Sequence, residues 1–255
     1  MKPYTLITGA TSGIGLELAR IATREKRNLV MVSRSEKDLK IVAKELTDLE
    51  SSVEFLAADL SQAGEAQKVF NFCAKKKLNI TELINNAGSG DYGEFADSNL
   101  ARQTAMINLN VTAVTELTRL FLPAMRAQKA GRILNLGSVA SFLTGPNMSV
   151  YFATKNYVLS FSRALSEELR GSGVTVTCLC PGATKTGFGK SAHVSTSHST
   201  AHAKTTAREV AEFGWYQMQS GEPVAIYGAS NRLMLQLAKL VPRNLLARVV
   251  KKVQK

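Results

Sequence analysis

Short apolar runs alternate with amphipathic stretches along nearly the whole chain. The apolar runs predict strands, whereas the stretches between them repeat apolar positions every three or four residues and predict helices. Alternation of this kind forms a parallel sheet with helices on both faces, so we expect one doubly wound α/β domain of three layers. The predicted strands are 4–8, 28–33, 53–57, 82–85, 132–137, 174–180 and 224–227. The predicted helices are 14–25, 36–49, 61–76, 98–128, 149–171 and 207–219.

A glycine-rich turn joins the first predicted strand to the first predicted helix. Its glycines, Gly9, Gly13 and Gly15, have the spacing G-x-x-x-G-x-G. Gly9 permits a tight turn, Gly13 lets the backbone approach a pyrophosphate, and Gly15 lets the helix and the strand pack closely. Unpaired amides and the positive end of the helix attract phosphate, which favours a dinucleotide site over an ordinary glycine-rich turn.

A second pattern carries candidate chemistry: Tyr151 and Lys155 are four residues apart, and Ser138 precedes the tyrosine by thirteen residues. At this spacing the tyrosine and the lysine share one helix face, and a nearby ammonium lowers the pKa of a phenol from about 10. We therefore expect Tyr151 to serve as a general acid and base, with Ser138 holding a substrate oxygen. The spacing alone arises by chance on many amphipathic helices, so the motifs around Tyr151 and Lys155 decide whether the pair is catalytic.

Glycine and polar residues follow the carboxyl ends of six predicted strands, where open α/β sheets bind their ligands. Asn85 and Asn86 also fit a second interpretation, as turn residues that bond the local backbone. Asp59 likewise fits the N-cap of a helix beginning at Ser61. The residues at the strand ends are Gly9, Arg34, Asp59, Asn85, Asn86, Ala87, Gly88, Ser138, Pro181 and Gly182.

The charge after the second strand bears on the choice of dinucleotide. NAD enzymes usually place an acid there to bond both ribose hydroxyls, and an acid would repel a 2′-phosphate. This chain has Ser33 and Arg34 instead, and a guanidinium pairs well with phosphate. We therefore expect NADP(H) rather than NAD(H), although Glu36 lies close enough to bind a ribose if the loop turns differently.

Composition limits the other classes of function. The 255 residues are 45% hydrophobic and 20% charged, which suits one globular domain, and no apolar run reaches the ~18 residues of a membrane span. The chain goes directly into its first predicted strand, so we expect no signal peptide. Its cysteines, Cys73, Cys178 and Cys180, form no disulfide pattern, so we expect free buried thiols and a cytoplasmic protein.

The basic charge is concentrated at the C-terminus. Net charge is +12, and residues 231–255 carry +7 of it and no acid. The rest of the chain has little excess charge and no nucleic-acid motif, so we expect no nucleic-acid partner. Pro242 must break the helical pattern of this tail, which predicts two amphipathic pieces. Two interpretations stay open: contact with an anionic membrane surface or an acyl carrier, or packing on the body beside the substrate cleft or a subunit contact.

Several motifs together match one known family. They are 8–15 (Thr-Gly-Ala-Thr-Ser-Gly-Ile-Gly), Asp59-Leu60, 85–88 (Asn-Asn-Ala-Gly), Asn110 within 107–113, Ser138, 151–155 (Tyr-Phe-Ala-Thr-Lys), and Pro181-Gly182 followed by Thr184 and Thr186. On these motifs the chain resembles the short-chain dehydrogenase/reductase family over nearly its whole length, and its tail resembles that of a bacterial subgroup. The resemblance implies a Rossmann-type fold with seven strands, a catalytic domain at 1–230 and a basic C-terminal extension at 231–255. It also implies a homodimer or homotetramer formed through 98–128 and 149–171.

The resemblance also implies a role for each candidate residue. Tyr151 protonates the carbonyl oxygen that receives a hydride, and Ser138 hydrogen-bonds the same oxygen. Lys155 lowers the tyrosine pKa and holds the nicotinamide ribose, and Asn110 anchors a water in a proton relay. A solvated or capping amide is the other interpretation of such an asparagine, and Asn108 suits it better. The expected cofactor contacts, from the residues and the resemblance together, are Gly9, Thr11, Ser12, Gly13, Ile14, Gly15, Ser33, Arg34, Asp59, Leu60, Asn86, Ala87, Gly88, Tyr151, Lys155, Pro181, Gly182, Thr184 and Thr186.

By the same resemblance, residues 187–205 form a mobile lid over the substrate, and 89–96 and 140–148 complete its pocket. The apolar residues in these stretches favour an apolar ketone, a 3-oxoacyl compound or a steroid-like substrate. They include Phe142, Leu143, Met148 and Phe188. The histidines of the chain, His193, His198 and His202, all fall in the lid without a carboxylate or cysteine beside them, so we expect no metal site.

The leading hypothesis is an NADP(H)-dependent oxidoreductase that transfers hydride between nicotinamide and a carbonyl or secondary alcohol carbon. The alternative is a non-catalytic protein of the same fold that senses the cofactor or docks on a membrane. Such proteins typically lack the tyrosine or the lysine, and this chain has both Tyr151 and Lys155.

Overall fold

The main sheet of the protein is parallel and has seven strands. The computed structural model describes residues 2–47, 51–192 and 204–253. The strands of the sheet are β1 (Pro3–Thr8), β2 (Asn28–Ser33), β3 (Val53–Ala57), β4 (Asn79–Asn85), β5 (Gly131–Leu136), β6 (Val174–Cys180) and β9 (Val224–Ile226). Their order across the sheet is β3-β2-β1-β4-β5-β6-β9. Successive strands are added on one side of β1 up to β3 and on its other side from β4 onward, so the strand order reverses between β1 and β4. The predicted doubly wound, Rossmann-type sheet is confirmed.

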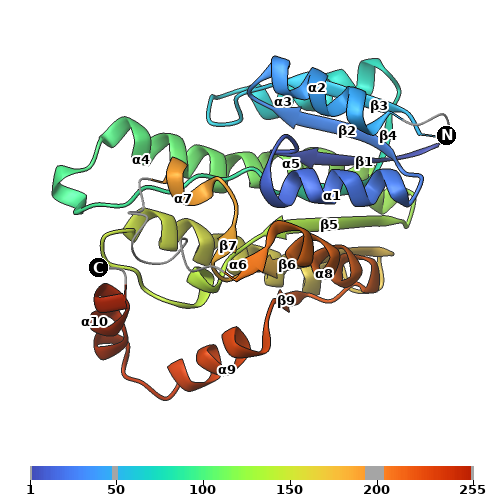
Figure 1. Cartoon of the computed structure of the whole chain (residues 1–255). Helices are drawn as coiled ribbons and strands as arrows, with labels where there is room; N and C mark the ends of the chain where they lie inside the picture. Colours follow the sequence, from blue (N-terminus) through green and yellow to red (C-terminus); the bar gives the residue numbers. More distant parts are fainter. Residues whose placement is uncertain (1, 48–50, 193–203, 254–255) are drawn as a thin grey trace.

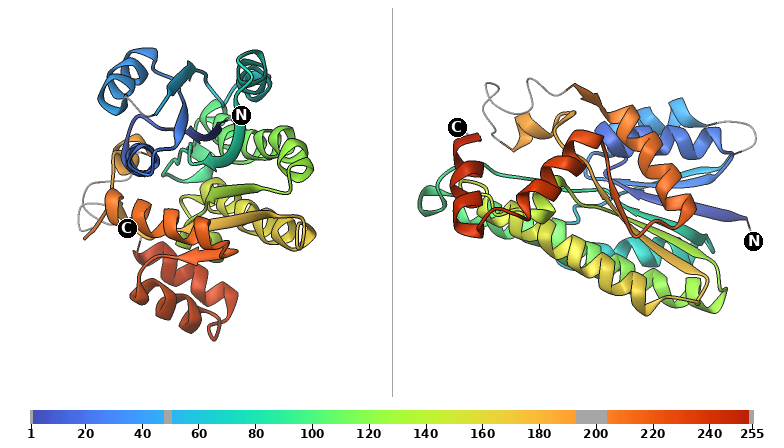
Figure 2. Two further views of the ribbon diagram at one scale, coloured as in Figure 1. Left: turned by 90° about the vertical axis from the view of Figure 1, so that its right-hand side faces the viewer. Right: turned by 90° about the horizontal axis from the view of Figure 1, so that it is seen from below.

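Helices connect the strands and cover both faces of the sheet, which makes three layers (Figures 1 and 2). The α-helices of the described residues are α1 (Gly13–Arg24), α2 (Glu36–Leu46), α3 (Glu65–Lys75), α4 (Leu100–Ile107), α5 (Ala113–Ala127), α6 (Ser149–Glu168), α7 (Phe188–Ser191), α8 (Ala207–Ser220), and, after the last strand, α9 (Ala229–Ala238) and α10 (Arg243–Val253). The apolar core between α1, α2, α8 and the sheet includes Leu18 and Trp215. The core on the other face, under α3, α5 and α6, includes Phe121 and Leu165.

The stretch predicted as one helix over 98–128 is three segments. After α4 the chain makes a π-helical turn at Asn108–Thr112, and α5 then begins at Ala113. A π turn holds one extra residue, and here it contains the buried Asn110. The predicted helical stretch thus continues through the π turn, which apolar periodicity does not reveal because the periodicity continues on both sides of a single inserted residue.

Several predicted helix boundaries also differ from the structure, and the helix predicted at 149–171 ends at Glu168. The helix predicted at 61–76 begins at Glu65, because Gly64 takes the left-handed conformation just before it, with φ of +81°. The helix predicted at 36–49 ends at Leu46, where Thr47 returns to extended backbone.

The segment after β9 forms α9 and α10 on either side of Pro242. Figure 1 shows α10 at the same end of the molecule as α7, near the label of the C-terminus. A Cβ placed on Gly182 would lie 2.6 Å from Nδ2 of Asn231, at the start of α9. Val250 of α10 packs against Met148 and its neighbours. The C-terminal helices therefore contact the end of the sheet that holds the candidate site. None of the helices in the described part of the chain combines the length and the apolar character needed to span a membrane.

Close packing of α1 against the turn after β1 leaves no room for a side chain at residue 15. A Cβ built on Gly15 would clash with the carbonyl oxygen of Gly9 and with the amide of Asn86. We expect Gly15→Ala to lower the free energy of unfolding by about 1–3 kcal/mol, the usual cost of overpacking. Gly187→Ala is the matched control, since nothing lies within 4 Å of a Cβ there. Urea unfolding measures both variants, and equal midpoints would contradict the prediction.

Candidate active site

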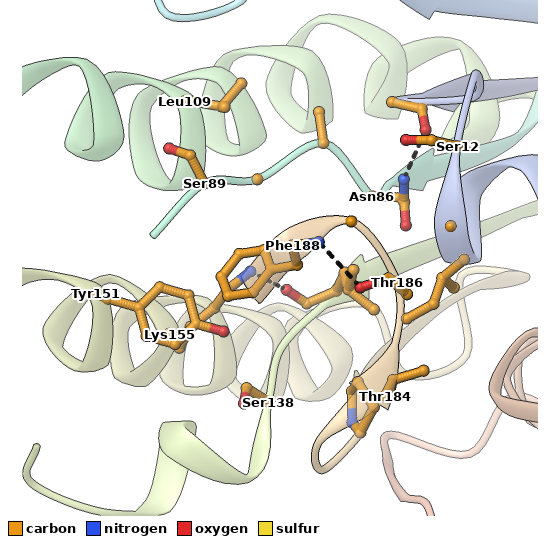
Figure 3. Close-up of a pocket in the computed structure, with 18 of the residues that line it drawn as sticks. Ser12, Asn86, Ser89, Leu109, Ser138, Tyr151, Lys155, Thr184, Thr186 and Phe188 are labelled. Carbon is orange, nitrogen blue, oxygen red and sulfur yellow. Dashed lines mark hydrogen bonds between the residues drawn. The ribbon is translucent and has the colours of Figure 1, made fainter. Parts of the chain in front are cut away.

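A cavity of about 730 Å³ opens at the carboxyl ends of the strands. Its volume falls in the range of ordinary ligand pockets. The glycine-rich turn after β1 lines one part of it, and Ser138, Tyr151 and Lys155 line another (Figure 3). Every residue predicted to bind the cofactor or to take part in catalysis lines this cavity except Gly15 and Asn110, which do not reach its wall. Phe142 was predicted to line the substrate pocket, but it packs instead against the buried cluster that includes Val158 and Cys178. The structure thus brings together residues that are up to 177 positions apart, from Gly9 to Thr186.

Hydrogen bonds from the end of β4 hold the glycine-rich turn in place. Oγ1 of Thr8 accepts from the backbone N–H groups of Asn86 and Ala87, both at 3.0 Å. The amide of Asn86 donates to the carbonyl oxygens of Thr8, at 2.9 Å, and Gly9, at 3.2 Å. Gly9 has φ of +67°, which favours glycine, and a Cβ there would meet Asn86 and Ala87 at about 3 Å. This narrow cradle at the N-terminus of α1 suits a pyrophosphate.

One interpretation of the sequence expects the Asn85 side chain to bond the local backbone, but in the structure this side chain bonds other side chains. Its Nδ2 donates to Oδ1 of Asn135 at 2.8 Å and to Oγ1 of Thr118 at 3.2 Å. Asn135 in turn donates to Ser162 at 2.9 Å. These buried bonds connect β4 to β5 and to helices on one face of the sheet.

The residues after β2 form the part of the cavity that suits an adenosine ribose. Oγ1 of Thr11 and Oγ of Ser33 are 3.0 Å apart and share a hydrogen bond. Arg34 is exposed and lines the cavity. Glu36 does not line the cavity, and its exposed carboxylate pairs with Lys40 at 2.7 Å.

Asp59 stabilises a turn rather than a helix N-terminus. Its Oδ1 accepts from the backbone N–H of Ser61 at 3.1 Å and from the hydroxyl of Ser61 at 2.8 Å. The N-cap interpretation is wrong, because α3 begins four residues after Ser61, at Glu65. Asp59 and Leu60 both line the cavity beside Arg34.

Asn110 ties the π-helical turn to the loop after β4. Its Oδ1 accepts from the backbone N–H of Ser89 at 3.0 Å, and its Nδ2 donates to the carbonyl oxygen of Ser89 at 2.9 Å and to Thr154 at 3.0 Å. A Cβ on Gly88 would lie 3.3 Å from this Oδ1 and 3.5 Å from Nζ of Lys155. One lone pair of Oδ1 is left for a further donor, so the predicted water beside Lys155 stays a prediction.

Lys155 is buried, and its ammonium faces backbone. Nζ donates to the carbonyl oxygen of Leu136 at 2.7 Å and lies 6.0 Å from the centroid of the Tyr151 ring. Burial lowers the pKa of Lys155 from 10.5 to about 8. The Sγ atoms of Cys178 and Cys180 are 3.7 Å apart, and both thiols are free and buried, as predicted. Each lies within 3 Å of the position that a Cβ on Gly137 would take, so residue 137 must be small.

The expected lowering of the Tyr151 pKa is wrong for the structure. Burial raises the pKa of Tyr151 to about 12, and this effect outweighs the opposite effect of the nearby Ser138 hydroxyl. The ammonium of Lys155 points to Leu136 and does not bond the phenol oxygen, which explains why it fails to offset the burial. Tyr151 is therefore neutral at physiological pH and holds the proton that a general acid needs.

Ser138 caps a 3₁₀ turn, Val139–Phe142, whose first two residues line the cavity. Its Oγ accepts from the backbone N–H of Ala140 at 3.1 Å, and its own N–H donates to Oγ of Ser141 at 3.1 Å. This reciprocal capping fixes the position of the Ser138 hydroxyl. The hydroxyl keeps its own hydrogen to donate toward the cavity.

Phe188 of α7 lies beside Tyr151 in the cavity (Figure 3). The two ring centroids are 5.4 Å apart. On its other side the Phe188 ring lies against Gly90, where a Cβ would come within 2.8 Å of Cζ. Any side chain at residue 90 would therefore displace the Phe188 ring.

Thr184 and Thr186 bring the segment after β6 back across the cavity. Thr184 starts β7 (Thr184–Lys185), which pairs with β8 (Thr205–Thr206). The methyl of Thr186 lies 3.3 Å from the position of a Cβ on Gly13, so this side chain covers the glycine-rich turn. The remainder of the predicted lid, with His193, His198 and His202, lies outside the described residues.

Sequence reasoning missed some residues that shape the site. Leu109 lines the cavity from the π-helical turn, and Val250 packs against the apolar cluster that includes Tyr151 and Met148. Leu109 belongs to the helical pattern and carried no signal of its own. Val250 is 99 positions from Tyr151, and no local pattern predicts a contact over that separation.

The family model for the short chain dehydrogenase matches residues 3–195. The chain therefore belongs to the short-chain dehydrogenase/reductase family, whose members are oxidoreductases that act on CH–OH and C=O groups. Ketoacyl reductase HetN of Nostoc sp. is 33% identical to it over 69% of this chain and 62% of that protein. Very-long-chain 3-oxoacyl-CoA reductase-A of Danio rerio is 34% identical over 70% of this chain and 57% of that protein. The matched part thus spans less than two thirds of these relatives.

Solved structures share the fold over nearly the whole chain. A short-chain dehydrogenase from Sphingobium yanoikuyae in complex with NADPH is 32% identical, with a TM-score of 0.82, and the match covers 93% of this chain and 94% of that one. A short-chain dehydrogenase/reductase from Burkholderia phymatum in complex with NAD has a TM-score of 0.86 at 24% identity, and the match covers 94% of this chain and 93% of that one. Because its sequence identity is only 24%, the Burkholderia phymatum structure shows similarity of fold alone.

The lowered pKa of Lys155 makes stability depend on pH. Between about 8 and 10.5 the unfolded chain binds more protons than the folded one, so the cost of the buried ammonium is fully present below pH 8 and disappears toward 10.5. We expect Lys155→Met to raise the free energy of unfolding relative to the unsubstituted protein, and this gain should shrink by roughly 1–3 kcal/mol over that interval. Loss of the hydrogen bond to Leu136 changes the free energy of unfolding by the same amount at every pH. The readout is therefore the change of the stability difference with pH. Urea unfolding measures it.

The control for this experiment is Lys75→Met, which replaces an exposed lysine on α3. The free energy of unfolding of Lys75→Met should differ from that of the unsubstituted protein by the same amount throughout this pH interval. A flat profile for Lys155→Met as well would contradict the prediction.

Proposed function

We propose that this protein is an NADP(H)-dependent oxidoreductase that transfers hydride between nicotinamide and a carbonyl or secondary alcohol carbon. The observation that carries the proposal is the presence of Ser138, Tyr151 and Lys155 in the same cavity as the glycine-rich turn. The cradle made by Gly9, Asn86 and Ala87 fits a pyrophosphate, because a side chain at Gly9 would fill it. When bound, the nicotinamide supplies or accepts the hydride.

In the reductive direction, negative charge grows on the carbonyl oxygen and must be neutralised. Tyr151 is held neutral by burial and has the proton to give to this oxygen. Ser138 donates to the same oxygen, because its Oγ already accepts from Ala140 and its hydrogen is left to point into the cavity. The two groups together stabilise the oxyanion and then protonate it.

Lys155 acts behind the tyrosine. With a pKa of about 8, its ammonium can lose and regain a proton near neutral pH, so it can resupply Tyr151. The same ammonium is a donor for a ribose hydroxyl of the cofactor. Asn110 fixes Ser89 and Thr154 around it, which keeps this part of the wall rigid.

The preference for NADP(H) over NAD(H) is supported by charge. Arg34 lines the cavity directly after β2, and a guanidinium suits a 2′-phosphate. Glu36, the acid closest to this position along the chain, is engaged by Lys40 at 2.7 Å. A free carboxylate, which an NAD enzyme uses to bond the ribose, therefore does not come from Glu36.

The substrate class that fits the cavity is an apolar carbonyl compound, and among these we favour a 3-oxoacyl thioester. The wall near Tyr151 is apolar and consists of Tyr92, Leu143, Met148, Phe152 and Phe188. Two relatives have names that describe them as 3-oxoacyl or ketoacyl reductases. An apolar ketone or a steroid-like substrate would meet the same wall.

Two further proposals concern the setting of the enzyme. The exposed apolar side chains Ile107 and Tyr157 suit a subunit contact between copies, and Tyr157 stacks on Phe161 at 5.8 Å. We therefore expect a homodimer or homotetramer formed through α4, α5 and α6. The free, buried thiols of Cys178 and Cys180 suit a location in the cytoplasm. A non-catalytic cofactor sensor is less well supported, because the tyrosine, the lysine and the serine share one cavity.

Removal of the phenol oxygen should abolish turnover and spare binding. We expect Tyr151→Phe to lower kcat for reduction of a 3-oxoacyl thioester by about 10³-fold, since general acid catalysis typically contributes 10²–10⁴-fold. NADPH binding, followed by fluorescence titration, should not change, because the ring keeps its contacts. Tyr157→Phe on the same helix is the control and should leave kcat intact. Full activity of Tyr151→Phe would refute the assigned chemistry.

Reversal of charge at residue 34 should reverse the cofactor preference. We expect Arg34→Asp to lower the ratio of kcat/KM for NADPH to that for NADH by about 100-fold, because a charge-assisted bond is replaced by repulsion. Lys37→Asp makes the same charge change nearby, at a residue that does not line the cavity. It should leave the ratio within about twofold. An unchanged ratio in Arg34→Asp would show that the assignment of NADP(H) is wrong.

A further inference from the structure

The two C-terminal helices carry an unusual share of the exposed apolar surface. Six of the twelve exposed large apolar residues in the described part of the chain lie between residues 233 and 249. We call these six residues the tail surface: Leu233, Met234, Leu237, Leu240, Leu245 and Val249. Such a concentration of exposed apolar side chains typically marks an interaction site.

The tail surface follows helical spacing. Leu233, Leu237 and Leu240 are at i, i+4 and i+7 on and just after α9, and they are 62%, 56% and 81% exposed. Leu245 and Val249 are at i and i+4 on α10 and are about half exposed. Residues at these spacings share one face of a helix. Each helix therefore presents an outward apolar stripe, which is Leu233 and Leu237 on α9, with Leu240 in the turn that follows, and Leu245 and Val249 on α10.

Packing on the body does not account for this stripe, because other side chains make that contact. On α9 the inward residue is Leu235, which is 5% exposed. On α10 it is Val250, which packs against Met148 and Phe152. Each helix thus has one apolar face on the body and a second apolar face outside it.

Cations flank the tail surface, and acids are absent from it. Residues 229–253 contain six basic residues and no Asp or Glu. The six are Arg232, Lys239, Arg243, Arg248, Lys251 and Lys252. Arg232, Lys239, Arg248 and Lys252 are exposed, and on α10 Arg248 and Lys252 are three residues after Leu245 and Val249. Long basic side chains beside an apolar stripe can reach headgroups while the stripe enters the acyl region.

We propose that the tail surface docks on an anionic lipid bilayer, with α9 and α10 lying in the plane of the interface. Charge complementarity selects this occupant. A second copy docked on the same face by two-fold symmetry would bring two cationic surfaces together, which is unfavourable. An acidic acyl carrier has the right charge, but the apolar stripe runs over two successive helices and offers a broad surface rather than a single contact point.

Docking in this way brings the active-site cavity to the bilayer. Val250, on the inner face of α10, belongs to the same apolar cluster as Tyr92, Leu143 and Tyr151, which line the cavity. An apolar substrate held in the membrane would then have a short route to Tyr151. This consequence rests on the proposed function, whereas the docking itself does not.

Vesicle sedimentation of the full-length protein tests the docking. At low salt we expect retention by vesicles of phosphatidylcholine with phosphatidylglycerol, little retention by phosphatidylcholine alone, and release by added salt. Arg248→Gln with Lys252→Gln should weaken binding about thirtyfold. Leu237→Ser with Leu240→Ser removes two exposed leucines without changing charge and should weaken it at least as much.

The matched controls lie on other surfaces of the protein. Lys37→Gln with Lys75→Gln removes two exposed cations, and Ile41→Ser with Tyr216→Ser removes two exposed apolar side chains. Both should bind the anionic vesicles within about threefold of the unsubstituted protein. Turnover of a water-soluble ketone in the absence of lipid should be the same in all four variants, which separates failure of docking from failure of the proposed function.

Three outcomes would overturn the proposal. The first is no retention of the unsubstituted protein by anionic vesicles at low salt. The second is retention that the tail variants leave unchanged. The third is an oligomer without lipid that dissociates in the tail variants by sedimentation velocity, or a complex with an acidic acyl carrier that only the tail variants lose, since another partner would then cover the tail surface.

Discussion

The site depends on a few hydrogen bonds that join β1 to β4 at their carboxyl ends. The hydroxyl of Thr8 accepts from the amides of Asn86 and Ala87, and the side chain of Asn86 donates back to Thr8 and Gly9. A parallel sheet aligns strands but does not by itself determine the path of the turns that follow them. These bonds do so here, and the positions of Gly9, the N-terminus of α1 and the cavity wall all follow from them.

Burial at the other part of the cavity sets its chemistry. It raises the pKa of Tyr151 to about 12 and lowers the pKa of Lys155 to about 8. Both shifts have the same origin, because burial disfavours the charged form of each side chain, the tyrosinate and the ammonium. The tyrosine keeps its proton, and the lysine can exchange one near neutral pH. Burial, rather than attraction between the two side chains, thus gives Tyr151 a proton to donate and lets Lys155 replace that proton.

Much of the fold could be predicted from the sequence, because in this architecture each strand ends where an apolar run gives way to glycine or polar residues. Three of the seven strands, 28–33, 53–57 and 174–180, match the structure at both ends. The errors are local. A π turn at Asn108–Thr112 and the left-handed Gly64 each depend on one residue, and a periodicity averaged over many residues does not register them.

The sequence by itself determined the order of the elements and the residues at the strand ends, because hydrophobic periodicity and glycine spacing are local properties. The tertiary structure decided how those residues behave. It paired Glu36 with Lys40, set the Phe188 ring beside Tyr151, and packed Val250 against the apolar cluster that includes Met148. It also reversed the expected shift of the Tyr151 pKa. Desolvation and contacts between distant residues are properties of the packed chain, so no local pattern carries them.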